Sequence, residues 1–152
     1  MIEQLWWKET KQLTVVSSVT QISAIHALPP SGLFYSARMS GQDMVDADGV
    51  FTQFYEHLRL PDYFGWNWDA LRDCLHDFHW LPAAHILLTI DAAESILQEM
   101  NDERRSFYRM LSGAAKYWAA KADLPGQDKV TFRTVLLCDP GMEAALRAQM
   151  PD

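Results

Sequence analysis

The sequence has little of what indicates an exported or membrane protein. Only two of its 152 residues are cysteines, and both Cys74 and Cys138 lie in apolar patterns. We therefore expect buried free thiols in a reducing compartment rather than a disulfide. No stretch approaches the roughly 20 apolar residues that a membrane helix requires. Residues 1–8 include the acidic Glu3 and no long apolar run, so we expect no signal peptide and a cytoplasmic location.

Positive charge is also scarce. Lysine and arginine together number 13 against 20 aspartates and glutamates, which gives a formal net charge of −7. This acidity argues against direct binding to nucleic acid or to an anionic membrane, and it permits a basic protein partner. A hydrophobic fraction of 49% over 152 residues is typical of a single globular domain.

The motifs of common enzyme classes are missing as well. The sequence has no glycine-rich phosphate loop and no nucleophile elbow. His76 and His79, with Asp73 or Asp77 nearby, have the spacing of a helical metal pair. A metal site would need a third ligand and a second shell, for which His85 is no more than a candidate, so polar surface is the preferred interpretation. Nothing around Asp69 and Asp73 would separate their pKa values, as an acid–base pair requires. We predict no catalytic function, no metal and no cofactor.

Hydrophobic periodicity predicts alternating strands and helices. Apolar or β-branched segments of strand length lie at 13–16, 32–39, 83–90 and 130–138. Apolar stripes at helical spacing follow Asp46 or Asp48, which can cap the first helix, and run through residues 102–122 and 142–149. We expect Pro61 to end the first helix, and the capping-box-like pair Asp91 and Glu94 to open another short one.

This order of elements predicts an α/β fold with a small three-stranded parallel sheet packed with helices and right-handed crossovers. We expect one domain over residues 1–152, with a core at about 32–138. Residues 1–31 add an N-terminal strand and residues 139–152 a C-terminal helix. Trp6 and Trp7 are interpreted as core residues of the N-terminal extension rather than partner contacts. The sequence leaves open whether the added strand joins the sheet edge and whether the extensions form a dimer.

Residues 60–80, LPDYFGWNWDALRDCLHDFHW, are the most informative stretch. Gly65 is available for a positive φ in an irregular loop, and Asn67 is a suitable N-cap for a helix from Trp68 to about Asp77. The core-facing positions of this helix are Leu71, Cys74, Leu75 and Phe78. The opposite, solvent-facing positions are Asp69, Arg72, Asp73 and His76.

The loop places Tyr63, Phe64 and Trp66 next to these carboxylates. Large rings beside charged groups are typical of an interface, although a solvated helix face is the simpler alternative. Trp68 and Trp80 are predicted to belong to the core. Between residues 61 and 80 the formal charge is four aspartates against one arginine, or −3, so the implied partner surface is cationic.

These residues also carry a family resemblance. Leu60-Pro61-Asp62-Tyr63-Phe64-Gly65, then Asn67, Asp69-Ala70-Leu71 and Asp73-Cys74-Leu75 resemble the signature of the barstar family of ribonuclease inhibitors. The order of strands and helices is similar to that fold over residues 32–138. The resemblance implies that the loop and helix plug a ribonuclease active site, with carboxylates where substrate phosphates would bind.

By position, the resemblance assigns partner contacts to Tyr63, Gly65, Asn67, Asp69 and Asp73. Two residues depart from the family pattern: Arg72 stands in place of an aromatic residue and Trp66 in place of a polar one. A further acidic contact of the family, late in the long helix, has only Asp123 as a match among residues 117–123.

We therefore predict a monomeric inhibitor or immunity protein that binds a toxin-type or secreted ribonuclease, or another basic toxin domain. The alternative is a protein-binding adaptor or regulator of the same fold, whose partner is not a nuclease. The predicted partner-binding residues are Asp62, Tyr63, Phe64, Gly65, Trp66, Asn67, Asp69, Arg72, Asp73 and His76.

Overall fold

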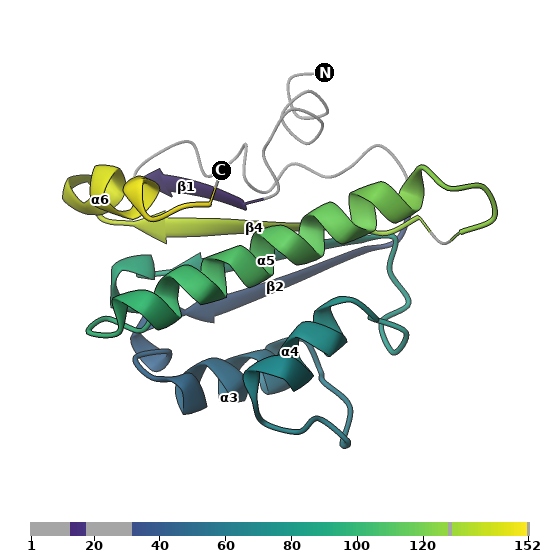
Figure 1. The fold of residues 1–152 in the computed structure, drawn as a ribbon, viewed down its shortest axis with the longest axis horizontal. Helices are drawn as coiled ribbons and strands as arrows, with labels where there is room; N and C mark the ends of the chain where they lie inside the picture. Colours follow the sequence, from purple (N-terminus) through teal and green to yellow (C-terminus); the bar gives the residue numbers. More distant parts are fainter. Residues whose placement is uncertain (1–12, 18–31, 128, 152) are drawn as a thin grey trace.

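The computed structural model describes residues 13–17, 32–127 and 129–151. Its centre is a parallel sheet of four strands in the order β1-β4-β3-β2 (Figure 1). The strands are β1 (Leu13–Ser17), β2 (Phe34–Ser40), β3 (His85–Asp91) and β4 (Thr131–Cys138). The helices are α3 (Ala47–His57), α4 (Trp68–Leu75), α5 (Asn101–Ala122) and α6 (Glu143–Ala148), with 3-10 turns at Gly41–Asp43, Ala93–Ser95 and Pro140–Met142.

The predicted α/β architecture is confirmed, and the question of the N-terminal strand is answered. Strand β1 pairs in parallel with β4, with Leu13 opposite Thr134, and forms one edge of the sheet. Strand β3 occupies an inner position and is buried along almost its whole length, as its unbroken apolar run predicted.

The main core lies between one face of the sheet and helices α3, α4 and α5. Strand residues such as Met39, Leu88 and Leu136 pack there with the helical residues Phe54 and Phe107. Helix α5 lies across the sheet, while α3 and α4 lie together on the β2 side (Figure 1). The helix that carries the predicted site is therefore packed into this core, mainly against α5.

Helix α3 begins as predicted and ends earlier than predicted. The Asp46 side chain caps it by accepting a hydrogen bond from the Gly49 amide at 2.8 Å. The helix stops at His57, not at Pro61, because Arg59 adopts a left-handed conformation with φ of 53°. A left-handed residue after the last turn terminates a helix independently of a later proline.

The capping box expected at Asp91 and Glu94 does not form. Asp91 instead accepts two hydrogen bonds of 2.7 Å from the Arg38 guanidinium, and the next residue, Ala92, is left-handed. Glu94 accepts a hydrogen bond from the Asp139 amide at 2.8 Å. The segment after β3 is consequently a single 3-10 turn without a side-chain cap.

The C-terminal helix packs on the core. Helix α6 lies beside β1 (Figure 1) and buries Leu146, and the Arg147 Nη2 donates a hydrogen bond of 3.1 Å to the Val15 carbonyl. The prediction for Trp6 and Trp7 lies outside the described residues. In the described part of the chain, none of the helices has the length and apolar character needed to cross a membrane.

Candidate partner-binding site

The loop before α4 exposes two of its three aromatic rings. Tyr63 is 66% exposed and Trp66 is 48% exposed. Phe64, which we expected among the exposed interface rings, is instead buried, and its ring contacts Phe51 of α3 edge-on at a centroid distance of 6.1 Å. Phe64 therefore anchors the loop in the core.

Trp66, not Gly65, takes the positive φ in this loop. Its φ is 53°, and its ring lies 5.0 Å from that of Tyr55 and 5.3 Å from that of Phe64. Gly65 has a different role: a Cβ there would stand 3.3 Å from Asn67 Nδ2 and 3.4 Å from Ala70 Cβ. The glycine thus lets the loop approach the first turn of α4 closely.

Helix α4 starts at the predicted cap. The Asn67 side chain accepts a hydrogen bond from the Ala70 amide at 2.8 Å and donates one to the Gly65 carbonyl at 3.1 Å. The helix ends at Leu75 rather than near Asp77, because the following residues turn and Phe78 is left-handed with φ of 54°.

The two faces of α4 are arranged as predicted. Its core-facing side chains are all buried: Leu71, Cys74 and Leu75, followed by Phe78. Burial, together with the negative charges of Asp77 and Asp73, raises the pKa of the Cys74 thiol, which suits a protonated core residue rather than a nucleophile. On the other side, Asp69, Arg72 and Asp73 are exposed.

The two helix carboxylates differ in their surroundings. The Asp69 side chain is 86% exposed and lies 3.4 Å from the Arg72 guanidinium, a loose ion pair at i, i+3. Asp73 has no ion pair among the described residues. An exposed and uncompensated carboxylate on a rigid helix is available to a cationic partner.

A small hollow lies between the aromatic loop and the acidic side of α4. It has a volume of about 170 Å³, and its walls include Tyr63, Gly65, Asp73 and Asp77. The Tyr63 ring, which forms part of the wall, stacks on the His79 imidazole. The two rings are parallel, with a centroid distance of 6.4 Å. The carboxylates at this hollow would favour a positively charged group.

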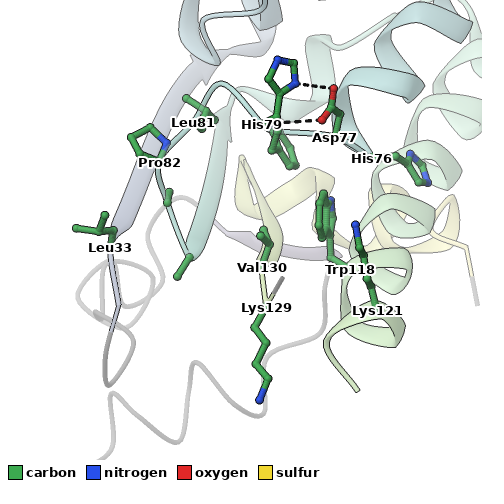
Figure 2. Close-up of a pocket in the computed structure, with 13 residues that line it drawn as sticks. Leu33, His76, Asp77, His79, Leu81, Pro82, Trp118, Lys121, Lys129 and Val130 are labelled. Atoms are coloured by element: carbon green, nitrogen blue, oxygen red, sulfur yellow. Dashed lines mark hydrogen bonds and ion pairs between the residues drawn. The ribbon is translucent and has the colours of Figure 1, made fainter. Parts of the chain in front are cut away.

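A larger cleft of about 520 Å³ opens beyond the end of α4 (Figure 2). On one side, Asp77 accepts a hydrogen bond from the His79 amide and lies 2.8 Å from the His79 ring nitrogen Nδ1. On the other, the Lys121 ammonium lies 4.9 Å from the centre of the Trp118 ring, and Lys129 extends away from the cleft. Sequence reasoning did not assign this cleft, because α5 and the residues before β4 contribute part of its wall, and these segments lie far from α4 in the sequence.

His76 differs in part from the prediction. It is half-buried rather than fully exposed, with its Nδ1 2.7 Å from the Arg72 carbonyl and its ring 4.6 Å from that of Tyr117. His85 lies apart at the start of β3, with its Nδ1 3.1 Å from Thr131 Oγ1. Within the described residues, no three or more histidines, cysteines or acidic residues are grouped to hold a metal ion.

The family model described as Barstar (barnase inhibitor) matches residues 34–136. The chain belongs to the barstar family. The match runs from the first residue of β2 almost to the end of β4, so it contains the whole aromatic loop and α4. Strand β1 and helix α6 are additions outside it. No curated protein matches the chain.

Proposed function

We propose that this barstar-family protein inhibits a cationic ribonuclease by covering its active site with the loop and α4. The observation that carries the proposal is the position of Asp73, an exposed carboxylate without an ion pair among the described residues, which lines the same hollow as the exposed ring of Tyr63. Trp66 and Asp69 extend this surface, which we call the acidic face: Tyr63, Trp66, Asp69 and Asp73.

The chemistry of ribonucleases explains why such a surface would block them. Their active sites hold cationic side chains that bind RNA phosphates, and carboxylates can occupy the same positions. The aromatic rings would supply contact area at low entropic cost. The net charge of −7 would accelerate encounter with a basic enzyme.

Inhibition assays with a panel of purified basic ribonucleases, including barnase, would test the proposal. We expect stoichiometric loss of RNA hydrolysis for at least one enzyme, and an association rate that falls steeply as salt is added. If every enzyme in the panel keeps its activity in the presence of excess protein, the proposed function is wrong. An association rate that is independent of salt would reject electrostatic steering.

Arg72 supports a second candidate function. A guanidinium on α4 next to Asp69 is unfavourable opposite a uniformly basic enzyme, and it suits a partner of another class. The chain would then be an adaptor or regulator. Affinity capture from the host, followed by an RNA-degradation assay on the captured protein, distinguishes the two functions: a partner without ribonuclease activity favours the adaptor.

A further inference from the structure

A groove between α4 and α5 adjoins the acidic face. It has a volume of about 380 Å³ and is lined by Trp68, Asp69 and Arg72 from α4 and by Ser106, Arg109 and Met110 from α5. Asp69 belongs to both surfaces, so a partner that covers the acidic face also reaches the groove. The surface charge is positive there, because one arginine stands on each side of the groove: Arg72 on α4 and Arg109 on α5.

The two arginines of the groove are poorly neutralised. The Arg72 side chain is 58% exposed, and its one ion pair within the described residues is the 3.4 Å contact with Asp69. Arg109 donates a long hydrogen bond of 3.4 Å to the Arg105 carbonyl, and no carboxylate in the described part of the chain pairs with it. Like charges facing a partner are costly unless that partner supplies the opposite charge.

Gly113 gives independent evidence for contact at this place. It lies inside the long helix α5, three and four residues after the groove residues Met110 and Arg109, and therefore on the same helix surface. It is exposed, and a Cβ there would have no atom within 4 Å. Glycine in a helix interior is unfavourable, and packing among the described residues does not require it. Because Gly113 has no side chain, a partner could approach the α5 backbone closely at this position.

We propose that the groove binds an acidic segment of the same ribonuclease partner, with carboxylates opposite Arg72 and Arg109 and its backbone against Gly113. This inference rests on the proposed inhibitory function and specifies the partner further. The enzyme would carry basic residues opposite the acidic face and a neighbouring acidic segment opposite the groove. Arg72 is then a specificity residue.

The sign of a charge-reversal effect tests this proposal. The probe is the panel ribonuclease that the protein inhibits most strongly, and the variant is Arg72→Glu/Arg109→Glu. If the groove meets carboxylates, the dissociation constant rises at least about tenfold, as for loss of paired interfacial charges. If the groove meets only a basic surface, the added negative charge speeds association and tightens binding, and the proposal is overturned. Unchanged binding overturns it as well.

Lys129→Glu is the control for each single charge reversal, because it reverses one exposed charge outside the groove. It is expected to leave affinity unchanged or to increase it slightly through steering. If Lys129→Glu lowers the affinity as much as the groove variant does, the effect is one of overall charge and the groove contact is rejected.

Gly113→Ala separates stability from binding. Removing an exposed helical glycine is expected to raise the melting temperature by about 1–4 °C. In contrast, a partner backbone against Gly113 makes the same variant bind severalfold more weakly, and Gly113→Gln weaker still. Full affinity in both variants would exclude the close approach.

Asp73→Ala distinguishes failure of this inference from failure of the proposed function. If Asp73→Ala weakens inhibition while the groove variants do not, only the groove contact is wrong. If the unaltered protein inhibits no ribonuclease of the panel, both the proposed inhibitory function and the groove contact are wrong.

Discussion

The indole Nε1 of Trp118 in α5 donates a hydrogen bond of 2.8 Å to the carbonyl oxygen of Leu75, the last residue of α4. Both side chains are buried. Carbonyls at a helix end have no partner within the helix, so Trp118 satisfies one of them from a neighbouring element. The same indole stacks on Phe78 at 6.0 Å. One side chain thus fixes the end of the helix that carries Asp69 and Asp73.

Trp118→Phe is expected to destabilise the fold by about 1–3 kcal/mol, because it leaves the buried Leu75 carbonyl without its donor. Urea unfolding at equilibrium measures the change. Trp66→Phe is the control. Because the Trp66 ring is 48% exposed, this substitution should change the free energy of unfolding of the protein by less than about 0.5 kcal/mol. Equal losses in the two variants would contradict the role given to the Trp118 hydrogen bond.

Asp73→Ala is expected to weaken binding of the inhibited ribonuclease by about 2–5 kcal/mol, if the carboxylate is desolvated and paired in the complex. Titration of RNA hydrolysis gives the inhibition constants. Glu99→Ala removes the same charge at an exposed position before α5 and controls for steering alone. The difference between the two variants isolates the direct contact, and a difference near zero would leave Asp73 as a solvated residue.

Elements fixed by local chemistry could be predicted from the sequence. The apolar run of β3 needed no information from elsewhere in the chain, and neither did the Asn67 cap of α4. The inward and outward faces of α4 followed from its periodicity alone. Family membership, which the motif of residues 60–75 suggested, is confirmed by the match over residues 34–136.

Features that depend on distant residues could not be predicted. The burial of Phe64 depends on Phe51 of α3, and the pairing of Asp91 with Arg38 depends on strand register. The groove beside the acidic face exists only because Arg109 of α5 is brought next to Arg72 of α4. Such contacts between elements are set by tertiary packing, which propensity and periodicity do not contain.

The left-handed backbone of Trp66 makes a prediction about residue preference. With φ of 53°, any side chain with a Cβ is strained there by about 1–2 kcal/mol. Trp66→Gly should therefore be more stable than Trp66→Ala by about 1 kcal/mol, although glycine normally costs stability. Both variants lose the same ring contacts, so their difference in unfolding free energy reports the backbone alone. A more stable alanine variant would show that the loop relaxes out of this conformation.

Tyr108 predicts how stability depends on alkaline pH. Its side chain is fully buried, and its hydroxyl has no hydrogen-bond partner among the described residues. Burial raises the pKa of Tyr108 from 10.0 to about 12, with a smaller opposing effect from Arg104. The folded state therefore holds its proton at a pH where the unfolded chain has lost it. This contribution to stability is fully present below pH 10 and is lost as the pH rises towards 12.

The loss attributable to Tyr108 corresponds to roughly 2–3 kcal/mol between these pH values. Tyr108→Phe should remove that part of the alkaline slope and keep stability at neutral pH, since the buried hydroxyl has no described partner to lose. Tyr117→Phe, at an exposed position, should retain the full slope. Unfolding free energies at pH 7, 9, 10 and 11 test both variants. A slope that persists in Tyr108→Phe would assign the alkaline sensitivity to other groups.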